Sequence, residues 1–218
     1  MLKKHRNSQK RIYFEDACYF VTSKTHYNYP YFRERIFCDL FVENLRMCKR
    51  LKNFLLYGWV VIYDHIHLLF QPNDEWNISE VMQFLKRHIS RNINIVMGYQ
   101  QFSPSPGDDQ HPSPGGDISS SPGGDIGQCR LQNGGMIYKF DIFVLISKIR
   151  FTFKYLNQNP FPIFKWQKSF FDEYMRNNTE FNNFLDYIDY NPTKHNLPCG
   201  WPYVYTNPEY DDLNDEFL

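Results

Sequence analysis

The order of hydrophobic patterns in the first hundred residues constrains the fold of this chain more than any other feature. Residues 15–24 are typical of a strand, and residues 33–51 repeat apolar side chains at the three- and four-residue steps of a helix. Two more predicted strands, 54–62 and 65–71, are joined by a tight connection, and a second helix over 77–98 opens with a capping-box sequence. This order predicts a ferredoxin-like (RRM-like) α+β fold, an antiparallel sheet with helices packed on one face.

The pattern changes after the second helix. Residues 101–135 are rich in Ser, Pro, Gly and Asp and repeat a short motif every eight residues, which indicates a flexible low-complexity insertion. The apolar segment 136–155 has no clean period, so a helix and a pair of strands both remain open. Residues 165–176 resemble a last strand, and residues 179–191 predict a short helix that Pro192 stops.

Composition favours a single domain spanning residues 1–218 in a reducing compartment. The 20 Phe, 16 Tyr and 4 Trp supply a large core and surfaces on which bases could stack. The five cysteines are scattered and never form a CxxC pair, so we expect a cytoplasmic protein without a disulfide framework or zinc ribbon. No apolar run is long enough to cross a membrane, and we expect no membrane partner.

Net charge permits a nucleic-acid partner without requiring one. The formal charge is zero, but the tail at 209–218 carries five acids and no base, which leaves the rest of the chain with an excess of five bases. Solvated helix faces explain basic clusters equally well. The basic residues that we assign as candidate DNA contacts are Lys3, Lys4, Arg6, Lys10, Arg11, Lys86, Arg87 and Arg91.

Two histidines, His65 and His67, lie one residue apart inside an apolar run. Because alternate residues of a strand point to the same face, both imidazoles project side by side. Such a pair is half of a divalent-metal site, although an HxH sequence in a strand is often structural.

A second pair of polar residues, Tyr187 and Asn191, falls one helical turn apart near the C-terminus. At 100° per residue the two side chains lie within about 40° of each other on the predicted helix. If this helix packs near His65 and His67, the two imidazoles and the Asn191 amide oxygen could hold Mg²⁺ or Mn²⁺, with Tyr187 as a nucleophile toward a phosphodiester. The plainer alternatives are a core tyrosine and an ordinary Asn-Pro helix stop.

Three segments resemble the single-tyrosine HUH transposases, the IS200-like family, and above all their REP-associated branch. The segment 57–69 resembles the HUH strand, 166–173 resembles the WQ-x-S/R-F-[FWY] strand, and 186–195 resembles the YI-x-x-NP-x-K motif. The likeness covers roughly residues 11–97 and 160–203. Many members carry Pro-Asn or Pro-Glu where this chain has Tyr and Asp before the first histidine.

The resemblance implies a ferredoxin-like catalytic domain that nicks and rejoins single-stranded DNA, often at hairpins of repeat sequences. It implies His65 and His67 as metal ligands, Asn191 as a third ligand and Tyr187 as the nucleophile that joins a DNA 5′ phosphate. The implied partners are single-stranded or hairpin DNA, with the protein acting as a monomer or homodimer.

Two other interpretations stay open at this point. The chain could be a non-catalytic single-stranded nucleic-acid binding module, with Tyr13, Tyr19 and Phe20 stacking on bases. It could also be a structural or interaction protein in which the HxH sequence is coincidental.

Overall fold

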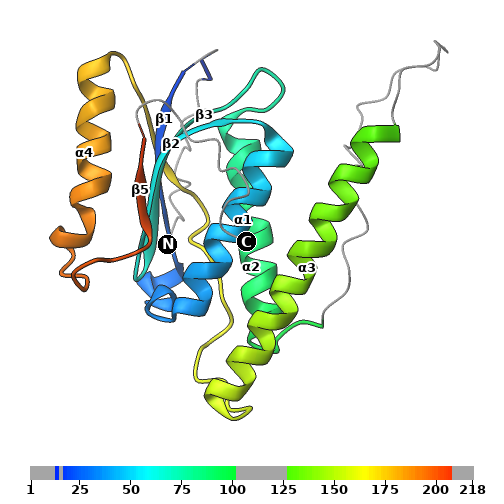
Figure 1. The fold of residues 1–218 in the computed structure, drawn as a ribbon. Helices are drawn as coiled ribbons and strands as arrows, with labels where there is room; N and C mark the ends of the chain where they lie inside the picture. The colour runs from blue at the N-terminus through cyan, green and yellow to red at the C-terminus, as the bar shows by residue number, and fades with distance from the viewer. Residues whose placement is uncertain (1–12, 15–16, 102–126, 208–218) are drawn as a thin grey trace, which may run out of the picture.

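The computed structural model describes residues 13–14, 17–101 and 127–207, and Figure 1 shows their arrangement. One antiparallel sheet has the strand order β4-β1-β3-β2-β5. The strands are β1 (Tyr19–Lys24), β2 (Leu55–Ile62), β3 (His65–Gln71), β4 (Phe171–Tyr174) and β5 (Val204–Thr206). The α-helices are α1 (Arg35–Lys52), α2 (Ile78–Val96), α3 (Gly127–Tyr155) and α4 (Asn178–Lys194), and two short 3-10 turns cover His26–Asn28 and Tyr31–Arg33.

Helices cover both faces of the sheet. The helices α1 and α2 pack on one face, α3 lies outside them, and α4 lies alone on the other face (Figure 1). The central strands β2 and β3 are therefore buried on both sides, which explains why their sequence is a nearly continuous apolar run. Of the residues of β3, only Gln71 is not fully buried.

The N-cap of α1 ties the outer helix to the core. The Glu34 side chain accepts a hydrogen bond from the Ile36 N–H, and its other oxygen accepts from Lys154 Nζ at 2.6 Å and from the Tyr155 hydroxyl. Glu34 is only 4% exposed, and these bonds hold its pKa below the usual range although burial alone would raise it. The C-terminal end of α3 is thus fixed by a buried carboxylate.

The seam between α4 and the sheet requires a glycine. Leu185 and Ile188 of α4 are buried against β2 and β5. A Cβ atom on Gly58 of β2 would lie 3.1 Å from Ile188 Cδ1 and 3.2 Å from the carbonyl oxygen of Tyr205. The missing side chain lets α4 approach the sheet closely, which sets the height of the helix above β3.

The structure confirms the predicted α+β class and corrects several element boundaries. Residues 136–155 are helical as part of α3, which settles the open choice between a helix and strands. The predicted end of α4 at Pro192 is wrong, because the helix runs through the proline to Lys194. A proline in the last turn forfeits one backbone hydrogen bond, and little helix remains to be disrupted beyond it.

The predicted insertion at 101–135 is only partly within the described residues. Residues 102–126 lie outside them, and α3 begins at Gly127, so the end of the predicted insertion is helical. The acidic tail also lies outside the described ranges. Within the described ranges, no helix is long and apolar enough to cross a membrane. The single-domain organisation stays a prediction.

Candidate active site

The two histidines of β3 lie side by side on the face of the sheet that α4 covers. Their ring centroids are 4.9 Å apart, edge to face, and the side chains are 6% and 4% exposed for His65 and His67. Ile66 between them points into the layer of α1 and α2 and is fully buried. The alternation predicted from the sequence therefore places both imidazoles toward α4.

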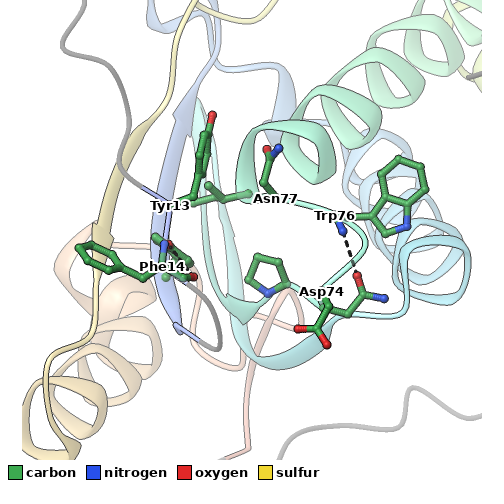
Figure 2. A pocket seen from close by; sticks show the side chains of 9 residues that line it. Tyr13, Phe14, Asp74, Trp76 and Asn77 are labelled. Carbon is green, nitrogen blue, oxygen red and sulfur yellow. Dashed lines mark hydrogen bonds between the residues drawn. The ribbon is translucent and has the colours of Figure 1, made fainter. Parts of the chain in front are cut away.

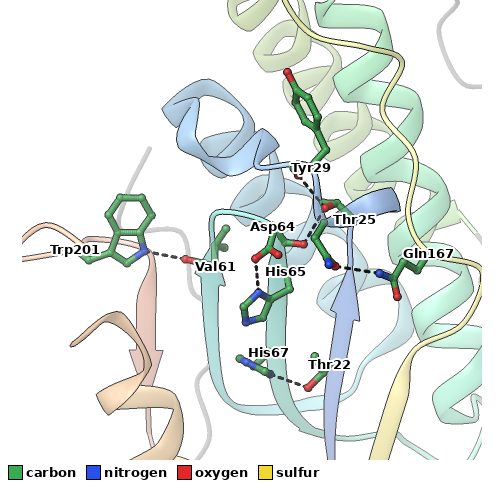
Figure 3. Close-up of polar contacts among 10 residues, drawn as sticks. Thr22, Thr25, Tyr29, Val61, Asp64, His65, His67, Gln167 and Trp201 are labelled. Carbon is green, nitrogen blue, oxygen red and sulfur yellow. Dashed lines mark hydrogen bonds and ion pairs between the residues drawn. The ribbon is translucent and has the colours of Figure 1, made fainter. Parts of the chain in front are cut away.

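Each imidazole is oriented by a neighbour at its Nδ1 atom (Figure 3). The Asp64 carboxylate lies 2.6 Å from His65 Nδ1, and the Thr22 hydroxyl lies 2.8 Å from His67 Nδ1. Thr22 is the β1 residue directly paired with His67. With the proton on Nδ1, each ring donates to its neighbour and presents the lone pair of Nε2, the arrangement that metal-binding histidines use.

The turn that carries Asp64 is itself fixed. The Thr25 N–H donates to the Asp64 carbonyl oxygen at 2.8 Å, and the Thr25 hydroxyl lies 2.8 and 2.9 Å from the carbonyl oxygens of Tyr29 and Asp64. Beyond Thr25, the Gln167 N–H donates to the carbonyl of Lys24 at 2.8 Å. The WQ segment thus holds the end of β1 beside the hairpin rather than reaching the histidines (Figure 3).

Burial keeps both histidines neutral. Desolvation, together with smaller effects of the nearby His65, His195, Lys194 and Lys24, lowers the pKa of His67 to about 2. Desolvation also lowers the pKa of His65, against a smaller opposing effect of Asp64. Neutral imidazole is the form that binds a metal ion.

The helix α4 brings Tyr187 and Asn191 to the histidines. The Tyr187 ring lies 5.3 Å from the His67 ring, edge to face, and Phe20 packs beneath both, stacked on His67 at 5.1 Å and edge-on to Tyr187 at 5.7 Å. Asn191 is fully buried, and its Nδ2 donates to the Tyr187 carbonyl at 3.0 Å. The structure therefore brings together all four residues that the sequence singled out for chemistry.

Two buried polar atoms of this cluster have no hydrogen-bond partner: His67 Nε2 and Asn191 Oδ1. An unpaired buried polar atom is costly, so a ligand that both atoms could bind would relieve the cost. A divalent cation fits an imidazole nitrogen and an amide oxygen. No three His, Cys, Asp or Glu side chains of the described residues gather as a metal site, so a site here needs the Asn191 amide.

Three cationic or titratable side chains that sequence reasoning did not assign surround the cluster. Lys24 on β1 is paired with His65, the His195 ring lies 5.0 Å from the His65 ring, and Lys194 Nζ lies 3.2 Å from the Tyr187 hydroxyl oxygen. The position of Lys194 and His195, two and three residues after Pro192, was the available signal. Lys24 and Lys194 place positive charge beside the cluster, which favours an anionic group such as a phosphate.

The basic residues predicted to contact DNA fall into two groups, one outside the described residues and one on α2. Lys3, Lys4, Arg6, Lys10 and Arg11 lie outside the described residues. Lys86, Arg87 and Arg91 lie on α2, on the opposite side of the sheet from α4 (Figure 1). Lys86 Nζ donates to the carbonyls of Gln167 and Ser169 at 3.0 and 3.3 Å, so it braces the WQ segment. DNA contact by these residues stays a prediction.

Tyr13, Tyr19 and Phe20, the residues expected to stack on bases in a non-catalytic binding module, do not all lie together. Tyr13 and Tyr19 line a surface pocket of about 260 Å³ together with Phe14, Trp76 and Asn77 (Figure 2). This pocket follows the end of β3, whereas the histidines stand at its start. Phe20 is 4% exposed and packs under the candidate active site, so its ring is closed to a base.

The metal-free protein is expected to lose stability on acidification because of His67. In the unfolded chain an imidazole takes up a proton near its ordinary pKa of about 6.5, whereas folded His67 stays neutral. Below that pH the unfolded state binds more protons, so the free energy of unfolding falls with pH, by about 2 kcal/mol between pH 7 and 5. Urea unfolding in EDTA measures this loss. His67→Gln should reduce the pH dependence, and His65 and His195, whose pKa values are also lowered by burial, account for the remainder; an unchanged pH slope in that variant would contradict the assignment.

Residues 15–102 match the family model described as IS200-like transposase. No curated protein matches the sequence. Among solved structures, the chain is similar to a REP-associated tyrosine transposase bound to a REP hairpin, at a TM-score of 0.50 and 14% identity over 89% of this chain and 79% of that one. A candidate transposase from Deinococcus radiodurans gives a TM-score of 0.40 and 14% identity over 82% and 93% of the two chains. The first likeness supports the α+β fold.

Proposed function

Because residues 15–102 match the family model of the IS200-like transposases, we propose that the chain nicks and rejoins single-stranded DNA through a covalent bond to Tyr187. The observation that carries the proposal is the convergence of a tyrosine from α4 with a buried, neutral histidine and an amide whose Nε2 and Oδ1 atoms have no partner. A ligand bound by these two atoms would account for their lack of a hydrogen-bond partner.

We assign His65, His67 and Asn191 as the residues that would hold one divalent cation, Mg²⁺ or Mn²⁺. The donor set of two imidazole nitrogens and one amide oxygen suits Mn²⁺ better than Mg²⁺ on ligand softness. When bound, such a cation polarises a phosphodiester and stabilises the charge that develops on it. Asp64 and Thr22 orient the two imidazoles from behind, as outer partners of metal-binding histidines do.

The side chains of this site divide the remaining tasks. Tyr187 supplies the attacking oxygen, and Phe20 fixes the positions of the Tyr187 and His67 rings against each other. Lys24 and Lys194 give the site a positive charge toward the DNA backbone. The product is a DNA 5′ phosphate joined to tyrosine and a free 3′ hydroxyl, which can later reverse the reaction or join another strand.

We propose a hairpin of repeat DNA as the substrate class. The support is the likeness of the fold to a transposase whose structure holds a REP hairpin. A hairpin presents unpaired nucleotides at its foot in a fixed geometry, which suits a site that accepts a single strand.

The test is incubation of the protein with labelled single-stranded DNA carrying a palindromic hairpin, in Mn²⁺ or Mg²⁺, followed by a denaturing gel. We expect a protein–DNA adduct that disappears in EDTA and returns when Mn²⁺ is added back. A fully duplex DNA of the same sequence is the matched control and should give no adduct. A native gel shift without any adduct would contradict the enzyme and favour the binding module.

A further inference from the structure

The geometry of Lys194 sets it apart from the other cations near the site. Its Nζ donates a hydrogen bond to the Tyr187 hydroxyl oxygen at 3.2 Å and lies 4.6 Å from the centroid of the same ring. The two residues are two turns apart on α4. Long side chains on a helix lean toward its N-terminus, which lets the ammonium reach back to the phenol.

The Lys194 ammonium forms no ion pair with an acidic side chain within the described parts of the chain. Of the charged and titratable groups toward the histidines, Lys24 is a second cation, and His67 and His195 are neutral because burial lowers their pKa. The Asp64 carboxylate lies against His65 Nδ1. An anion at the Tyr187 oxygen would be stabilised by the Lys194 ammonium beside it. The position therefore suits a negative charge that is present only during the reaction.

We propose that Lys194 is a catalytic residue that stabilises negative charge on the Tyr187 oxygen, both when this oxygen attacks phosphorus and when it leaves. This role rests on the proposed function. A preformed donor aimed at an atom where charge develops acts mainly in the transition state, because the neutral phenol before reaction and the neutral ester oxygen after it gain less from the cation.

The step balances as follows for cleavage. The Tyr187 oxygen forms a bond to phosphorus, the bond between phosphorus and the 3′ oxygen breaks, and the phenol proton passes to water while the departing 3′ oxygen takes a proton from water. Rejoining is the reverse: a 3′ hydroxyl attacks, and the Tyr187 oxygen departs with the electron pair. Lys194 keeps its own proton throughout and faces the same oxygen in both directions.

A structural alternative exists for the same lysine. A cation in the last turn of a helix also interacts favourably with the helix dipole. In that role Lys194 would affect the stability of the helix, and any residue that preserves the helix would fulfil it. The rates of cleavage and rejoining at saturating DNA would not change. Kinetics of both directions therefore separate the two roles.

The experiment measures single-turnover cleavage and rejoining at saturating hairpin DNA for the wild type, Lys194→Met and Lys194→Arg. We expect Lys194→Met to slow cleavage and rejoining alike, by about 10- to 100-fold as for loss of a hydrogen bond to a charged group, with an unchanged fraction of adduct at equilibrium. Lys194→Arg, which keeps the cation, should recover most of the rate. Lys148→Met, on α3 and so on the other side of the sheet from α4, is the matched control for loss of one positive charge.

The outcomes are distinct. Equal rates for Lys194→Met and wild type at saturating DNA, with only weaker DNA binding, would overturn the role of Lys194 and leave the proposed function standing. A slowing of cleavage without a slowing of rejoining would also overturn it. A lower melting temperature with unchanged rates would assign Lys194 to the helix end. A wild-type protein that forms no adduct with any hairpin would overturn both proposals together.

Discussion

Replacing Tyr187 by phenylalanine is expected to abolish the covalent DNA adduct and to slow strand cleavage by at least about 10⁴-fold, because the only attacking oxygen is removed. The fold should survive, since the ring keeps its contacts with Phe20 and His67 and only its hydroxyl, which bonds Lys194, is lost. DNA binding should stay within a few fold of the wild type. Labelled hairpin DNA on denaturing and native gels measures both quantities.

The matched control is Tyr190→Phe on the same helix. Tyr190 is 60% exposed and lies on the solvent side of α4, so its hydroxyl is expected to be dispensable. An adduct that persists in Tyr187→Phe and disappears in Tyr190→Phe would show that the wrong tyrosine has been assigned. Loss in both variants would point to damage of the helix instead, which circular dichroism would reveal.

Replacing His67 by alanine is expected to remove metal-dependent cleavage almost completely, by about 1,000-fold or more. The loss reflects several kcal/mol of charge stabilisation that depend on a correctly held cation. Titration calorimetry with Mn²⁺ should show weaker binding than in the wild type. Since the alanine also leaves a cavity beside Phe20, the melting temperature must be measured in parallel.

A second variant separates metal binding from packing at His67. Thr22→Val removes only the hydroxyl that holds His67 Nδ1, so we expect a smaller loss of metal affinity, about 10- to 100-fold, with the imidazole still present. A graded series of wild type, Thr22→Val and His67→Ala is the expected result. Full activity in His67→Ala at low Mn²⁺ would rule out His67 as a ligand.

The histidine strand could be predicted because its chemistry and its fold use the same short-range rule. His65 and His67 alternate with apolar residues in a run that had to be a buried strand, so their shared face followed from the period of two. Tyr187 and Asn191 were likewise one turn apart on a helix with a recognisable apolar side. Their meeting with the histidines could not be read from spacing, because it depends on how α4 packs across β2 and β5.

Two features could not be predicted from the sequence: a helix with apolar residues on two sides, and a lysine side chain that contacts distant backbone. In α3, Val144 and Phe151 are buried while Ile146 and Ile149 are 49% and 56% exposed, so no single apolar stripe marks a helix. The hydrogen bonds of Lys86 to carbonyls some eighty residues away could likewise not be read from the sequence.

The role of Lys194 was hidden by the boundary error at Pro192. With the helix ended at Asn191, the lysine belonged to a loop of unknown direction. Only the continuation of α4 through the proline turns its ammonium back toward Tyr187. Because the helix was predicted to end three residues too early, the direction of the Lys194 side chain could not be inferred from the sequence.

The placement of Tyr187, Asn191 and Lys194 on one helix has a consequence for how mutation can remove the proposed activity. The three side chains lie on the same helix, α4. This helix packs closely on β2, where a Cβ atom on Gly58 would lie against Ile188. A drift of this seam by a fraction of an ångström moves nucleophile, amide and ammonium together relative to the histidines. Under the proposed function, one substitution in the seam abolishes activity while the histidines, Tyr187, Asn191 and Lys194 all stay unchanged, so the presence of these residues alone does not establish activity.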